Sequence, residues 1–416
     1  MKQVTAILLG AGQRGAQAYA SYALDNPNEL KFVGVAEPRQ DRREEFARMH
    51  GIAPENAVAS DMELLARPRM ADCVLICTQD QMHYKALKLA VERGYHILCE
   101  KPISPDRKEL EEIAEIAKNY DKVISICHVL RYSPFFTQIK KLLDEGRIGD
   151  LVSIQHIESV GFWHMAHSFV RGNWRNKELS SPMILQKCCH DMDILLWLVG
   201  SSCKRLSSFG SLTHFKEENA PEGAPAYCMD GCAHRDECPY FAPKFYIEDV
   251  EDHDGGFAKV VSIDTDKEPL LNALKTSPYG RCVYHCDNDV VDHQLVNLEF
   301  ENGVTASLTM CAFTQKCERI INLMGTKGQM RGNMEDNRIE IEDFATGNKT
   351  VTDLKVPKGN HSGSDVSMMK EFVWLVANGG TAKSVSAASK SIESHLMALD
   401  AEESRLQGGK VIDMKE

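Results

Sequence analysis

Several residues in one short segment have side chains that could do chemistry. The stretch SPMILQKCCHDMDILLWLVG, residues 181–200, contains a lysine, two adjacent cysteines, a histidine and two aspartates before an apolar run. Such a set could hold a metal, supply a thiol nucleophile or transfer protons. Gln186, His190, Asp193 and Trp197 recur at helical spacing, so we expect them to share one face of a single helix. The pattern lacks a fourth converging ligand for zinc, and the cysteine pair suits packing better than nucleophilic attack.

A second reactive side chain is Lys101, in the tripeptide Glu100-Lys101-Pro102. It follows the apolar run YHILC, which predicts a strand ending at this point. Pro102 restricts Lys101 to extended backbone and allows a cis peptide bond. A lysine fixed at the end of a strand beside a bound ligand could donate or accept a proton; the alternative is a surface lysine beside a glutamate.

The elements that must position these groups begin with VTAILLGAGQRG. An apolar strand runs into Gly10-x-Gly12-x-x-Gly15 and then a helical pattern, the context in which these glycines bind a dinucleotide pyrophosphate. A second strand ends in Glu37, about 20 residues later, where an acid accepts hydrogen bonds from the adenosine ribose. Glu37 favours NAD over NADP. Arg39 is the counter-argument, because an arginine there could hold a 2′-phosphate.

Strands and helices continue to alternate as far as KVISICHVL, which predicts a parallel, doubly wound α/β sheet. In such sheets the ligand lies at the carboxyl ends of the strands. We therefore predict that the cofactor is bound by Gly10, Gly12, Gln13, Arg14, Gly15, Glu37, Arg39, Thr78, Gln79, His83, Glu100 and Lys101.

The glycine fingerprint, the acid after the second strand, the EKP tripeptide and the later His-x-x-Asp element together resemble the Gfo/Idh/MocA oxidoreductases. The resemblance covers most of the chain. It implies a Rossmann domain, residues 1–127, followed by an α/β domain, residues 128–416, with an open, mostly antiparallel sheet. It also implies NAD(P)-dependent oxidation of a sugar or cyclitol hydroxyl. The alternative is a redox-neutral glycosidase or eliminating enzyme that keeps NAD bound and works through a transient keto-sugar; a third reading is a non-catalytic sugar sensor.

The resemblance assigns roles inside the opening segment. His190 matches the family's proton-transfer histidine, opposite Lys101. The family's preceding aspartate is Gln186 here, which cannot exchange a proton. We expect Lys187 to replace the missing charge and to act as a catalytic group, and Gln186 and Asp191 to contact substrate. Arg131 and Tyr132 match a motif near the substrate.

Upstream, GFWHMAHSFVRGNWRN combines aromatic faces with hydrogen-bonding groups, a mixture that suits sugar binding. The predicted substrate contacts there are Trp163, His164, Arg171 and Trp174. An ordinary loop anchored by tryptophan explains the composition equally well.

A cysteine-rich insertion at about residues 213–280 interrupts the second domain. Cys228, Cys232 and Cys238 lie in a polar, Pro/Gly-bearing loop, where metal ligation is more typical than core packing. A structural zinc needs a fourth ligand, and we predict Cys286, with Cys282 or His234 as alternatives. An iron–sulfur cluster is the rival cofactor, and free thiols are the simplest alternative.

Composition excludes several classes of partner. The 416 residues carry a net charge of -12, which argues against nucleic acids and anionic membranes. No apolar run approaches the roughly 20 residues that span a bilayer. We expect a cytoplasmic enzyme acting on a small sugar-like molecule, and the resemblance implies a homodimer or homotetramer.

Overall fold

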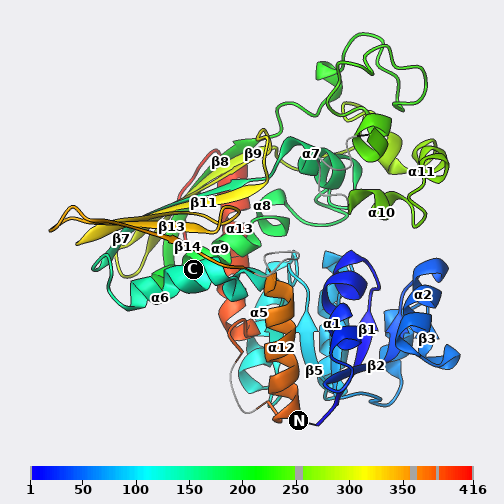
Figure 1. Cartoon of the computed structure of the whole chain (residues 1–416), viewed down its shortest axis with the longest axis horizontal. Helices are drawn as coiled ribbons and strands as arrows, with labels where there is room; N and C mark the ends of the chain where they lie inside the picture. Colours follow the sequence, from blue (N-terminus) through cyan, green and yellow to red (C-terminus); the bar gives the residue numbers. More distant parts are fainter. Residues whose placement is uncertain (1, 249–255, 357–362, 381–383, 415–416) are drawn as a thin grey trace.

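In the computed structural model, two α/β units lie next to each other, and a smaller lobe lies above the first unit and beside the sheet of the second (Figure 1). The structure describes residues 2–248, 256–356, 363–380 and 384–414. Within these residues no helix is long and apolar enough to cross a membrane.

The first unit is a six-stranded parallel sheet with the order β3-β2-β1-β4-β5-β6. Its strands are β1 (Val4–Leu9), β2 (Leu30–Ala36), β3 (Ala57–Val58), β4 (Cys73–Ile76), β5 (His96–Cys99) and β6 (Ile124–Ile126). They read as apolar runs because helices cover both faces, and all four residues of β4 are buried. The strand order reverses between β1 and β4, which is where such sheets bind ligands.

The helices of this unit are α1 (Ser21–Asp25), α2 (Gln40–His50), α3 (Asp61–Ala66), α4 (His83–Glu92) and α5 (Arg107–Asn119), with the π-helical turn η1 (Gln13–Tyr19) directly after the glycine loop. Asp106 caps α5 by accepting a hydrogen bond from the Glu109 amide. The Rossmann architecture predicted from the sequence is confirmed.

The second unit is a nine-stranded sheet with the order β14-β13-β12-β11-β7-β10-β9-β8-β15, antiparallel except between β7 and β10. The strands are β7 (Leu151–Ser159), β8 (Cys203–Ser211), β9 (His293–Phe300), β10 (Thr305–Cys311), β11 (Glu318–Gly325), β12 (Gly328–Asn333), β13 (Arg338–Asp343), β14 (Lys349–Asp353) and β15 (Ile412–Asp413). Buried and half-buried residues alternate strictly along β11, because only one of its faces packs against helices. This mostly antiparallel sheet also confirms the predicted fold class.

Helices α6 (Pro134–Asp144), α8 (Met183–Gln186), α9 (Cys189–Val199) and α13 (Ala388–Leu406) belong to the helical layer of this sheet, and α7 (Phe162–His164) and the π-helical turn η5 (Met165–Arg171) lead to the smaller lobe.

The end of the chain returns to the first unit. Helix α12 (Ser364–Ala377) places Met368 and Phe372 in the same core cluster as Leu8. Helix α13 joins both cores, because Ile392 packs with the first sheet and Met397 with the second. The first sheet ends at Ile126, next to the expected boundary, but two C-terminal helices complete its packing.

The insertion between β8 and β9 forms the smaller lobe in Figure 1. Its described elements include α10 (Phe257–Val261), α11 (Lys267–Leu274) and the short turn η8 (Pro278–Gly280). Cys228, Ala242, Phe245, Tyr246 and Leu274 form a small core of its own. Residues 249–255 of the expected insertion lie outside the described residues.

Candidate active site

The glycine loop has the shape that a pyrophosphate requires. Gly10 has φ +87°, and a Cβ there would lie 2.4 Å from the carbonyl oxygen of Cys77. A Cβ on Gly15 would lie 2.2 Å from the Gly10 oxygen. Among the described residues, the only atom within 4 Å of the corresponding position on Gly12 is Arg42 Nη1, at 3.9 Å. Gly10 and Gly15 therefore make the tight turn, and Gly12 leaves its surface free for a ligand.

Glu37 lies beside this loop. Its carboxylate accepts hydrogen bonds from the amides of Ala11 (2.8 Å) and Arg39 (3.0 Å). The side chain of Arg39 turns to Asp41, 2.6 Å away. Glu37 therefore holds a negative charge at the expected ribose position, while a neighbouring aspartate already pairs with Arg39. These residues fit NAD better than NADP.

Arg14 connects the glycine loop to Glu100. Its guanidinium donates to Glu100 at 3.1 Å and to Asp365, at the start of α12, at 2.7 Å. Tyr19 also donates to Glu100. Burial raises the pKa of Glu100, but the charges of Arg14 and Lys101 outweigh burial and hold that pKa below its ordinary value. Arg14 and Glu100 therefore hold each other beside the cofactor loop.

The loops after β4 and β5 are joined by His83. Its ring nitrogens lie 2.7 Å from the Pro102 oxygen and 3.0 Å from the Thr78 oxygen. His83 is 1% exposed, so it positions these loops rather than facing solvent. Gln79 is exposed at the carboxyl end of β4, where a ligand can reach it.

Lys101 spans the two units. It follows β5, its bond to Pro102 is cis as the sequence allowed, and its Nζ donates to the Gln186 carbonyl at 2.8 Å. A side chain from the cofactor-binding sheet thus contacts the segment that carries His190. The two reactive segments found in the sequence lie together.

The predicted single helix through this segment is wrong. Helix α8 ends at Gln186, and α9 begins at Cys189. The Gln186 carbonyl accepts from Lys101, and the Cys188 carbonyl starts the next helix by accepting from the amides of Asp191 (3.0 Å) and Met192 (2.9 Å). Gln186 and His190 therefore belong to two helices that meet at Lys187.

His190 lies in the first turn of α9 and is 7% exposed. Its ring packs edge to face against that of His128, with centroids 5.8 Å apart. Burial, followed by the charges of Arg131 and Lys101, lowers the pKa of His128 well below its ordinary value. The neutral imidazole of His128 thus packs against His190, and the charge of Lys101 acts on it.

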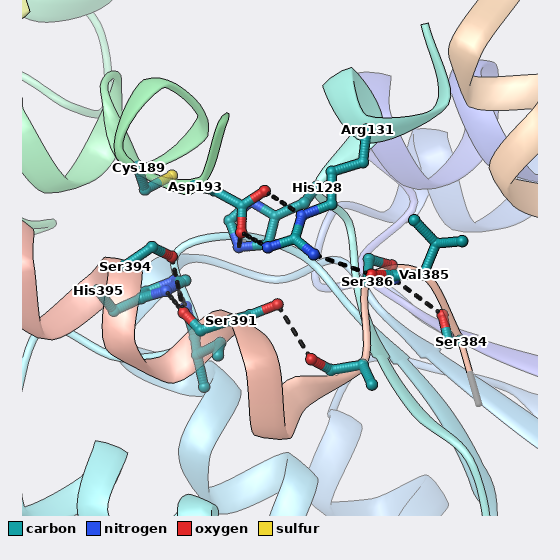
Figure 2. Close-up of polar contacts among 12 residues, drawn as sticks. His128, Arg131, Cys189, Asp193, Ser384, Val385, Ser386, Ser391, Ser394 and His395 are labelled. Atoms are coloured by element: carbon teal, nitrogen blue, oxygen red, sulfur yellow. Dashed lines mark hydrogen bonds and ion pairs between the residues drawn. The ribbon is translucent and has the colours of Figure 1, made fainter. Parts of the chain in front are cut away.

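Arg131 is a structural residue in this arrangement. Figure 2 shows its guanidinium against Asp193, with two hydrogen bonds of 2.7 Å, and a third at 3.0 Å to the Val385 carbonyl. The side chains of Arg131 and Asp193 are 2% and 1% exposed. The structure therefore gives Arg131 a buried partner in place of the expected substrate contact. Tyr132 likewise donates to Glu371 of α12.

Lys187 belongs to a buried charge cluster that was not predicted from the sequence. Its Nζ lies 3.1 Å from Glu158, which also pairs with Arg319 at 2.9 Å. Burial lowers the pKa of Lys187, but Glu158 outweighs it and raises that pKa above its ordinary value. Lys187 therefore stays protonated with its charge balanced, which does not support its expected role as a free catalytic charge.

Asp191 belongs to the same cluster. Its carboxylate accepts from Arg319 at 2.9 Å and lies 2.8 Å from His156 Nε2. Burial raises its pKa, but Arg319 and His156 together hold that pKa below the ordinary value. Asp191 has no exposed surface, so it stands behind the site and does not face a substrate. Alternation along β7 and β11 could have revealed the cluster, because charged residues occupy inward positions there.

The aromatic segment before the site divides into two groups. His164 is half-buried, and burial together with the charges of Lys187, His167 and Lys101 lowers its pKa well below the ordinary value. Trp163 stacks on it at 5.8 Å. The charges of Lys187 and Lys101 therefore act on His164, and Trp163 covers its ring.

Arg171 and Trp174 pack elsewhere. Arg171 is fully buried and donates to the carbonyls of Arg281 (2.8 Å) and Tyr240 (2.6 Å). Trp174 packs near Phe169, with ring centroids 6.3 Å apart. The expected substrate contact of Arg171 is replaced by a role in fixing the insertion.

The predicted metal site is not supported. Among the described residues, no group of three or more His, Cys, Asp or Glu side chains could hold a metal ion. Cys228, Cys232, Cys238 and Cys286 are free thiols. Arg171 lies 3.6 Å from the sulfur of Cys228, so a buried cation of the protein already lies among these thiols.

Comparison with known families decides the chain's affiliation. The profile of the Gfo/Idh/MocA oxidoreductases described as the NAD-binding Rossmann fold matches residues 4–128, and their C-terminal alpha/beta domain matches residues 140–404. The chain belongs to the Gfo/Idh/MocA oxidoreductase family. Its NAD-binding fold and its open second sheet are those of this family.

Relatives within the Gfo/Idh/MocA family include sugar and cyclitol dehydrogenases. Inositol 2-dehydrogenase of Corynebacterium glutamicum is 30% identical over 47% of this chain and 53% of its own length. D-glucoside 3-dehydrogenase of Escherichia coli is 26% identical over 35% of this chain and 40% of its own. The chain thus aligns with about half or less of these two relatives. A levoglucosan dehydrogenase in complex with NADH has the same fold, with a TM-score of 0.74, 16% identity and full coverage of both chains.

Proposed function

We propose that this protein is an NAD-dependent dehydrogenase that oxidises a hydroxyl group of a sugar, a cyclitol or a related small molecule. The observation that carries the proposal is the reach of Lys101 from the cofactor-binding sheet to Gln186, four residues before His190. At the carboxyl ends of the parallel strands, Lys101 thus contacts the segment that carries His190, and both side chains can exchange protons. The names of the family's relatives supply the substrate class.

Different residues bind the cofactor, fix the lysine and take the substrate proton. The glycine loop and Glu37 bind the dinucleotide, and Arg14 with Glu100 fixes the base of the lysine. Bound NAD supplies the acceptor for the hydride that leaves the substrate carbon. Lys101 or His190 takes the hydroxyl proton, so that the products are a carbonyl compound, a reduced cofactor and a proton. The buried cluster around Glu158 keeps Lys187 in place without adding net charge.

The test is an absorbance assay for NADH formation with a panel of sugars, cyclitols and sugar acids. We expect Lys101→Met to lower turnover by about 100-fold or more while NAD still binds. Lys118→Met is the matched control, because that side chain is 62% exposed. The proposal fails if no substrate yields a carbonyl product with either NAD or NADP, or if Lys101→Met is as active as the unmodified protein.

A redox-neutral eliminating enzyme is the second candidate. Such an enzyme must keep its cofactor while the sugar is oxidised and then reduced again. The position of the insertion favours it, because a Cβ on Gly256 would lie 3.3 Å from Gln13 Nε2, in the cofactor loop. NADH accumulates in the first case and does not in the second, so product analysis with glycosides separates them.

A further inference from the structure

The part of the insertion around α10 faces the glycine loop of the first domain. In Figure 1, α10 and α11 lie opposite the edge of the first sheet where β1 ends. Gly256 directly precedes α10 and approaches Gln13, as described above. A segment of the second domain therefore borders the loop that binds the pyrophosphate.

Two aromatic residues of the insertion are fixed by the same histidine. The ring of Phe257 stacks on His167 with centroids 3.9 Å apart and planes 11° from parallel, and Tyr279 stacks on it at 4.9 Å and 18°. His167 is 3% exposed, and its Nδ1 lies 2.8 Å from the hydroxyl of Tyr246. Because η5 supplies His167, these stacks tie the insertion to the domain that carries the proposed substrate site.

Electrostatic interactions also link Tyr279 to Arg42 and Arg39 of the first domain. Burial raises the pKa of its hydroxyl, and the nearby charges of Arg42 and Arg39 act in the opposite direction. Arg42 is the residue whose guanidinium lies over Gly12. The charge of Arg42 therefore acts on Tyr279 of the second domain, and the same guanidinium lies beside Gly12 of the first domain.

We propose that Gly256, Phe257 and Tyr279 form an outer wall of the cofactor site, so that the dinucleotide is enclosed between the two domains and dissociates slowly. The inference rests on the proposed binding of NAD. The insertion of the second domain builds this wall, on a side of the cofactor site that the Rossmann domain by itself would leave open to solvent. To release the cofactor, the wall must separate from the glycine loop, which ends the approach of Gly256 to Gln13.

The test measures release of NADH directly. Protein loaded with NADH is mixed with excess NAD in a stopped-flow fluorimeter, and the loss of bound-NADH fluorescence gives the dissociation rate. We expect slow release from the unmodified protein and release about 10-fold faster or more from Tyr279→Ala and Phe257→Leu. Tyr279→Phe keeps the stacked ring and should stay close to the unmodified rate. Phe344→Ala is the control, because this side chain is 61% exposed on a turn of the other sheet.

The outcomes separate the inference from the proposed function. Equal dissociation rates in the unmodified protein and in both wall variants overturn the wall, even if the protein is an active dehydrogenase. Absence of NADH binding to the unmodified protein overturns the proposed function and the wall together. A second readout is the nicotinamide cofactor released by acid from freshly purified protein. We expect nearly one per chain in the unmodified protein and clearly less in Tyr279→Ala.

Discussion

The pair of Arg131 and Asp193 allows the sharpest quantitative test of the structure. Replacing Arg131 by methionine leaves the Asp193 carboxylate, only 1% exposed, without its two 2.7 Å donors. Removing one partner of a buried ion pair costs about 3–5 kcal/mol of unfolding free energy. Burial raises the pKa of Asp193 and Arg131 opposes that rise, so losing Arg131 moves the pKa higher still. The native state of the variant then binds a proton that the unfolded chain releases, and the loss of stability grows as pH rises above about 4.

Urea denaturation followed by tryptophan fluorescence measures this effect. Trp197 is a local reporter, because the Arg131 guanidinium lies 5.7 Å from the centre of its ring. The midpoint for Arg131→Met should fall, and fall more at pH 8 than at pH 5. The control Arg235→Met, at a side chain that is 67% exposed, should change stability by less than about 0.5 kcal/mol. The double variant Arg131→Met with Asp193→Leu should recover most of the loss.

A different result would refute the reasoning. If Arg131→Met loses less than about 1 kcal/mol and instead raises the KM for substrate, then Arg131 serves the substrate and the buried pair is not its main partner.

Three further predictions concern single residues. The pH profile of kcat/KM should show the same ionisations in Lys187→Met as in the unmodified protein, because the raised pKa of Lys187 keeps it charged throughout. The loss of one ionisation in the variant would identify Lys187 as the base. Glu37→Ser should weaken NAD binding by about 10-fold and reduce the preference over NADP, measured by fluorescence titration with both cofactors; unchanged affinities would remove Glu37 from the ribose site. Burial, followed by the interaction with His128, lowers the pKa of His395 to about 3, whereas an unfolded histidine titrates near about 6.5. The unfolded state therefore takes up the proton first, and stability should fall as pH drops from about 6.5 towards 3. His395→Asn should flatten that part of the urea midpoint against pH, and an equally steep curve would contradict the assignment.

The parts of the site that the sequence predicted are those defined over short distances along the chain. The glycine loop and Glu37 depend on a few neighbouring residues and on the ends of two strands, and Pro102 allowed a cis bond without predicting it. Partners distant in sequence were not predictable in this way. Arg131 and Asp193 are 62 residues apart, and an arginine in a family motif looks the same whether it meets a substrate or a buried carboxylate.

The broken helix shows a second limit. Periodicity placed Gln186 and His190 on one face, and the residue types between them favour helix. The break depends on Lys101, 85 residues earlier in the chain, which takes the Gln186 carbonyl. The cluster of Glu158, Lys187 and Arg319 was within reach of pattern reasoning, because inward-facing charges on neighbouring strands must find partners.

Because of the hydrogen bond from Lys101 to Gln186, the position of the Lys101 amine depends on the angle between the two domains. One end is fixed to the cofactor-binding sheet and the other to a helix terminus of the second domain, 2.8 Å apart. A rotation that separates them by about 1 Å exceeds hydrogen-bonding distance and frees the Lys101 amine from the Gln186 carbonyl. In the proposed mechanism, Lys101 is therefore aligned only when the two domains are correctly seated. A ligand that separates the domains would then stop the reaction without contacting the lysine.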